Sequence, residues 1–209
     1  MARASSHRNN EYHFITNWRV EGMCGEVADV LGDPLALSRW WPSVYLDVQE
    51  QRPGSRDGVG RRVRLLTKGW LPYTLAWDFE VVESRYPSGF TIVANGDFEG
   101  VGVWTFTQDG GFVDIEYDWR IRAEKPILRA LSFLLKPVFS ANHRWAMARG
   151  AESLVLELAR RRATSEAGRA GIPPPPGPVT YTGVALVAGG AAIAATLVYL
   201  MVRARKDRV

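Results

Sequence analysis

Cysteine and histidine are both scarce in this chain of 209 residues, which contains one cysteine, Cys24, and three histidines. A single cysteine excludes an internal disulfide bond and any zinc site that is built from several cysteines. With so few histidines as well, the composition argues against a structural metal site. We therefore expect no metal and no other cofactor.

The chain also lacks the short motifs of common catalytic sites. It has no glycine-rich phosphate loop, no cluster of metal ligands and no nucleophile elbow. Its 26 lysines and arginines exceed its 22 acidic residues and give a net charge of +4. These basic residues do not form a stripe interleaved with exposed aromatics, so a nucleic-acid partner is not expected.

An export signal is missing too. Residues 1–14 contain no apolar core segment, which argues against a secretory signal, and residues 1–10 are polar, as in a disordered N-terminus. Without an export signal, the globular part of the chain is expected in the cytoplasm. The positive-inside rule favours the opposite orientation, because four basic residues lie in the last seven positions.

Charge is absent from residues 170–202. The part from Tyr181 to Val202 has about the 20 apolar residues that a helix needs to cross a bilayer, and Tyr199 stands where an interfacial aromatic does. We predict a membrane-spanning helix over residues 180–202, a basic tail over 203–209 and a single-pass protein of the cell membrane. A buried core helix is the alternative. Small residues spaced four apart, such as Ala185 and Gly189, would allow weak self-association of two spans.

The rest of the chain predicts an α+β domain over residues 11–162. A first strand is followed by two short helices that break at Asp33, and about six strands with tight turns come next, which is typical of an antiparallel meander. Two of these strands alternate apolar and charged residues along residues 73–81 and 112–123, so one face of the sheet is wet. A helix over residues 126–162 is expected to cover the dry face and to kink at Pro137. A proline-rich linker follows over residues 163–179.

Several sequence patterns together resemble those of a known superfamily. They are the stretch EVADVLGDP at residues 26–34, Trp40-Trp41-Pro42, a glycine turn at residues 58–60, GDFEG at residues 96–100 followed by Trp104-Thr105-Phe106, and RGAESL at residues 149–154. The chain resembles the START-related helix-grip superfamily, also called SRPBCC, and within it the polyketide cyclase/dehydrase and lipid-transport branch. The membrane-spanning segment is an addition to that domain.

The resemblance implies a curved antiparallel sheet wrapped around the long C-terminal helix, with a hydrophobic cavity between them. The predicted lining consists of large apolar side chains on the dry face of the sheet and on one face of the helix. These are Trp41, Trp77, Phe79, Phe90, Trp104, Phe106, Tyr117, Trp119, Leu135, Val138 and Trp145. The alternative is that these side chains simply fill the core.

Three functions remain open on this basis. The first is a membrane-anchored carrier or sensor of a hydrophobic small molecule or lipid, without catalytic activity. The second is a polyketide cyclase/dehydratase-like enzyme, for which His143 is the candidate acid or base and Asp97 with Glu99 an alternative at the rim. The third is an interaction module with a full core. The missing catalytic motifs favour the first.

Overall fold

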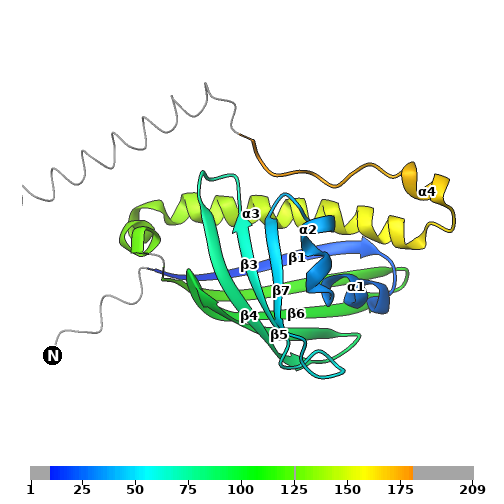
Figure 1. Cartoon of the computed structure of the whole chain (residues 1–209), viewed down its shortest axis with the longest axis horizontal. Helices are drawn as coiled ribbons and strands as arrows, with labels where there is room; N and C mark the ends of the chain where they lie inside the picture. Colours follow the sequence, from blue (N-terminus) through cyan, green and yellow to red (C-terminus); the bar gives the residue numbers. More distant parts are fainter. Residues whose placement is uncertain (1–9, 125, 181–209) are drawn as a thin grey trace, which may run out of the picture. The chain divides into compact units, whose positions relative to one another are not determined.

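The computed structural model describes residues 10–124 and 126–180, and of residues 126–135 the backbone alone. It contains seven strands and a long helix that packs on one face of the sheet (Figure 1). The elements in chain order are β1 (Glu11–Glu21), α1 (Cys24–Leu31), the 3₁₀ helix η1 (Pro34–Ala36), α2 (Leu37–Trp40), β2 (Tyr45–Arg52), β3 (Arg62–Lys68), β4 (Thr74–Ser84), β5 (Gly89–Gly96), β6 (Phe98–Asp109), β7 (Phe112–Ala123), α3 (Pro126–Arg162) and α4 (Glu166–Ala170).

All neighbouring strands of the sheet are antiparallel, in the order β1-β7-β6-β5-β4-β3-β2. The five pairs from β2 to β7 join strands that follow each other in the sequence, whereas β1 pairs with the last strand, β7. Strands β1 and β2 therefore form opposite edges, and the segment with α1 and α2 connects them. The strands curve below α3, so that the helix lies along the concave face (Figure 1).

Alternation along the strands decides which face is buried. In β7 the side chains of Val113, Ile115 and Tyr117 are buried, and the residues between them point away from the core. Ion pairs cover that outer face. Asp78 contacts Arg64 at 3.1 Å, and the sheet carries further pairs such as Arg19–Asp114 and Arg120–Asp118. Asp78, Glu80, Asp114 and Asp118 of the predicted solvent-exposed face thus pair with basic neighbours.

Helix α3 runs over the predicted bounds with Pro137 inside it. Its first turns run in a different direction from the rest of the helix (Figure 1), as expected where a proline removes one backbone hydrogen bond. Two close contacts hold the helix against the segments beside the sheet. A Cβ atom at Gly69 would overlap Asn142, and a Cβ at Gly150 would overlap the ring of Trp41.

The two ends of the domain differ in detail from the prediction. Asn10, which the sequence groups with a disordered N-terminus, is buried and donates a hydrogen bond from Nδ2 to the carbonyl of Ala123 at 2.9 Å. The predicted linker contains helix α4, whose N-cap Ser165 accepts a hydrogen bond from the amide of Gly168 at 3.0 Å.

The chain divides into two compact units, Met1–Pro178 and Val179–Val209. The predicted membrane-spanning helix at residues 180–202 and the basic tail lie outside the described residues, apart from residue 180. In the described part of the chain, no helix has both the length and the apolar character that crossing a bilayer requires.

Candidate ligand cavity between the sheet and helix α3

Two cavities lie on the concave face of the sheet, a small one below α3 and a large one that meets α3 only at Met147. The small cavity has a volume of about 160 Å³ and reaches Phe14, Phe139 and His143. The large cavity has a volume of about 680 Å³ and extends to α1 and the loop before β3. Ligand sites in proteins usually measure about 300–1,000 Å³. The large cavity falls in that range, and the small cavity is below it.

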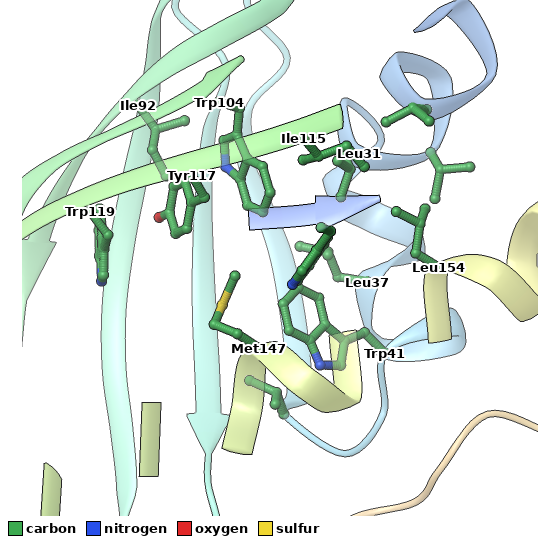
Figure 2. Close-up of a cluster of buried hydrophobic side chains, with 14 of the residues drawn as sticks. Leu31, Leu37, Trp41, Ile92, Trp104, Ile115, Tyr117, Trp119, Met147 and Leu154 are labelled. Carbon is green, nitrogen blue, oxygen red and sulfur yellow. The ribbon is translucent and has the colours of Figure 1, made fainter. Parts of the chain in front are cut away.

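A set of five side chains lines both cavities and separates them, and we call it the partition. It consists of Trp41, Tyr45, Trp77, Tyr117 and Met147. Figure 2 shows Met147 of α3 beside Trp41, with Tyr117 and Trp104 across from them on the sheet. The five residues come from five different segments of the chain, so the partition exists only in the folded protein.

The sheet side of the cavities is a row of stacked aromatic rings. The rings of Trp104 and Tyr117 are 4.0 Å apart and nearly parallel, and Trp119 follows at 5.5 Å from Tyr117. Such offset stacks add to the energy of burial. Gly102 makes this row possible, because a Cβ there would lie 2.7 Å from the Tyr117 hydroxyl and 2.8 Å from the Trp119 ring.

Most of the predicted lining residues border a cavity in the structure. Trp41, Trp77, Phe79, Phe90, Trp104, Tyr117 and Trp119 do so. Phe106 does not, because it is buried against the rings of Phe90 and Trp104 in the packed end of the core. The side chain of Leu135 lies outside the described residues.

The predicted cavity face of α3 is rotated by about one residue. Val138 and Trp145 border neither cavity. The helix instead presents Phe139, Asn142, His143, Ala146 and Met147. These positions also fit a helical period of 3.6 residues. Both the predicted and the observed face of the helix carry apolar residues, so the sequence permits either face to meet the cavity. The contacts of Asn142 and Gly150 with the rest of the domain select the observed one.

Sequence reasoning included Tyr117 in the site but missed Tyr45 and Tyr12. Tyr45 begins β2 directly after the Trp-Trp-Pro motif, and Tyr12 shares its face of β1 with Phe14. Burial raises the pKa of Tyr45 well above its usual value, and burial together with the charge of Tyr45 does the same for the pKa of Tyr117. Both hydroxyls are therefore protonated throughout the physiological pH range.

His143 lies where the catalytic hypothesis needs it, at the wall of the small cavity. Its ring stacks on Phe14 with 4.1 Å between centroids, and its Nε2 is buried without a hydrogen-bond partner. Burial, with a smaller effect of Arg144, lowers the pKa of the imidazole to about 4. His143 is thus neutral at pH 7, and no carboxylate of the described residues orients it.

The acidic pair at the rim is occupied by structural contacts. Asp97 accepts a hydrogen bond from the amide of Ala76 at 2.9 Å, and Glu99 forms an ion pair with Arg122 at 2.8 Å. Among the residues that the structure describes, no three or more His, Cys, Asp or Glu side chains are grouped so that they could hold a metal ion.

No protein-family model matches the sequence. A search of curated proteins finds no significant match either. The fold, in contrast, is similar to that of many solved structures.

Zhui aromatase/cyclase from Streptomyces sp. R1128 superposes with a TM-score of 0.57 and 16% identity, over 75% of this chain and 98% of that chain. Protein TTHA0849 from Thermus thermophilus superposes with a TM-score of 0.56 and 15% sequence identity, over 73% of this chain and 100% of that chain. The di-domain ARO/CYC BexL from the BE-7585A biosynthetic pathway superposes with a TM-score of 0.54 and 12% sequence identity, over 70% of this chain and 50% of that chain. At these identities the similarity establishes the fold. The chain has the helix-grip fold, as its sequence resemblance implies.

Proposed function

We propose that this protein binds an apolar small molecule, of aromatic or lipid-like type, in the cavity between the sheet and α3. The observation that carries the proposal is the large cavity of about 680 Å³ with aromatic walls. A fold that merely stabilised itself would gain from filling this space, because a cavity costs packing energy. The large cavity, which has the size of a ligand site, therefore favours the binding of a small molecule. It argues against the third function, an interaction module with a full core.

A second candidate function is cyclase or dehydratase-like chemistry in the same cavity. It is favoured by His143, whose neutral imidazole at the wall of the small cavity can accept a proton. Its pKa of about 4 makes it a weak base at pH 7, however, since an efficient general base has a pKa near the working pH. The structural similarity to aromatase/cyclases agrees with either function. Binding without catalysis is accordingly the better supported proposal.

The proposal is tested by filling the large cavity. Ile92 is 5% exposed and borders it, whereas its neighbour Val93 points to the outer face of the sheet. Titration of the full chain with the fluorescent probe 1-aminoanthracene should show saturable binding of one equivalent. We expect Ile92→Trp to weaken binding at least tenfold and Val93→Trp to leave it unchanged. Circular dichroism checks that both variants fold.

Absence of saturable binding by the wild-type chain would refute the proposal, and so would an equal loss in the two variants. Native mass spectrometry of the chain purified from cells complements the titration, because a stoichiometric co-purifying molecule would reveal the class of the natural ligand.

We further propose that the domain is tethered to the cell membrane through residues 181–202, with the domain on the cytoplasmic side. The support is the length of the uncharged stretch and its flanking tyrosines. A tether would hold the cavity near a bilayer, which is a source of apolar molecules.

A further inference from the structure

Two tyrosine hydroxyls belong to the partition between the cavities. Tyr45 comes from the start of β2 and Tyr117 from the middle of β7, and both border the small and the large cavity. Their rings are held by aromatic neighbours. Tyr45 packs edge-on against Trp41 at 5.2 Å, and Tyr117 lies flat on Trp104 at 4.0 Å. The two tyrosines are thus held in place at the boundary between the cavities, with the Tyr117 hydroxyl lying over Gly102 of β6.

Among the other polar side chains of the cavity walls, Trp41 Nε1 and His143 Nε2 are buried without a partner, whereas two have protein partners. Thr67 Oγ1 accepts a hydrogen bond from Trp77 Nε1 at 3.0 Å, and Asn142 Oδ1 accepts one from the amide of Leu71 at 3.2 Å. The hydroxyls of Tyr45 and Tyr117, in contrast, make no hydrogen bond within the described part of the chain. Both tyrosines border the cavities, and a polar group that faces an apolar space without a partner costs up to about 1–3 kcal/mol. Phenylalanine would avoid this cost at both positions.

On the basis of the proposed function, we infer that the ligand is a flat apolar molecule with a carbonyl-type acceptor near its middle, which Tyr45 and Tyr117 bind together. A carbonyl oxygen has two lone pairs and can accept a hydrogen bond from each hydroxyl. A ligand hydroxyl that donated to one tyrosine would leave a tyrosine proton without an acceptor. The position of the pair places apolar parts of the ligand in the cavities on either side.

Met147 allows one ligand to occupy both cavities. It belongs to the partition, is 6% exposed and faces Trp41 from α3 (Figure 2). The methionine side chain is unbranched and flexible, so it can change rotamer at low cost. The aromatic members of the partition are fixed by their stacks, which leaves Met147 as the member that moves.

The test compares three tricyclic probes of nearly the same shape: fluorene, 9-fluorenone and 9-fluorenol. Quenching of tryptophan fluorescence in the full chain gives each affinity. Two added hydrogen bonds should make fluorenone bind about tenfold more tightly than fluorene. The infrared carbonyl stretch of bound fluorenone should lie at a lower wavenumber than in hexane, as for a hydrogen-bonded carbonyl.

The variants remove hydroxyls without changing ring shape. Tyr45→Phe/Tyr117→Phe should lose both the preference for fluorenone and the infrared shift while keeping its affinity for fluorene. Each single variant should lose about threefold in fluorenone affinity. The single variants provide the test if the double variant does not fold. Tyr86→Phe is the control, because Tyr86 is 66% exposed at the rim of the large cavity and should behave like the wild type.

Each outcome decides between the two proposals. Equal affinity for fluorene and fluorenone with an unshifted carbonyl band overturns this inference and leaves the proposed binding function intact. Tighter binding of fluorenol than of fluorenone overturns the assignment of the tyrosines as a donor pair. If none of the three probes binds and 1-aminoanthracene does not bind either, the proposed function is refuted and this inference with it.

Discussion

At the scale of single residues, Gly150 of α3 is a position where helix propensity and tertiary packing predict opposite effects of a substitution on stability. Helix propensity alone predicts that Gly150→Ala stabilises the protein by up to about 1 kcal/mol. The Cβ atom would, however, overlap the buried ring of Trp41, and such overpacking costs about 1–3 kcal/mol. Because the ring is enclosed by Trp18, Trp40 and Tyr45, it has little room to yield.

We therefore expect Gly150→Ala to lower the free energy of unfolding by about 1–2 kcal/mol in urea titrations. Gly25→Ala in helix α1 is the matched control, because a Cβ there meets only the Tyr86 hydroxyl at 3.5 Å. That variant should be as stable as the wild type or slightly more stable. A stabilised Gly150→Ala protein would show that Trp41 does not lie against the helix backbone.

His143 should make the stability of the protein depend on pH. Its pKa is lowered to about 4 in the folded chain, against an ordinary value of 6.5. Between these values the unfolded chain binds the additional proton, so stability is fully present above pH 6.5 and declines as the pH falls toward 4. From pH 7.5 to 5.0 the loss is about 2 kcal/mol.

The comparison with His143→Phe isolates this contribution. Urea titrations at several pH values between about 5.0 and 7.5 avoid the range in which most carboxylates titrate. The variant should lose most of the pH dependence, while stacking on Phe14 remains possible. An unchanged dependence in the variant would mean that His143 is not buried in its neutral form.

At the scale of elements, a buried ion pair joins α2 to α3. The carboxylate of Glu157 is 1% exposed and accepts two hydrogen bonds from Arg39, at 2.7 and 2.8 Å, and one from Arg161 at 3.0 Å. Burial raises the pKa of Glu157, but the hydrogen bonds from the two arginines outweigh this effect and lower it overall. The stabilisation is therefore present above the unfolded value of about 4.5 and is lost as the pH falls through the lower folded pKa.

We expect Glu157→Gln to lower the free energy of unfolding at pH 7 by about 2 kcal/mol, since a charge-assisted pair is lost while Arg39 stays half-exposed to water. Glu152→Gln, in the exposed pair with Arg149 on the same helix, should cost less than about 0.5 kcal/mol. Equal effects of the two substitutions in urea titrations would contradict the role of Glu157 as the link between the helices.

At the scale of the whole molecule, the sheet and the elements packed on it enclose the cavities, and we propose a tether over residues 181–202, which lie outside the described residues. The full chain should sediment with membranes and resist extraction by alkaline carbonate, whereas a chain truncated after residue 179 should be released. Recovery of the full chain in the supernatant would rule out the span, and it would leave the binding proposal untouched, because all lining residues belong to the unit that ends at Pro178.

The sequence by itself determined the fold class and the bounds of its longest regular elements. Alternation along residues 112–123 and the run from Pro126 to Arg162 yield the observed bounds of β7 and α3, because these patterns are local and long. The resemblance carried by Trp40-Trp41-Pro42 and its companions indicated the helix-grip fold that the structural neighbours share.

Only the tertiary structure decided which face of α3 meets the cavities and which polar groups lie there. The apolar stripe of α3 permits two phases, and contacts distant in sequence, such as Gly150 with Trp41, select one. The position of both Tyr45 and Tyr117 at the boundary of the two cavities likewise depends on how far the sheet curves from β2 to β7. Curvature and packing are properties of the assembled core, so no local pattern encodes them, and the sequence left open whether the core is full or holds a ligand.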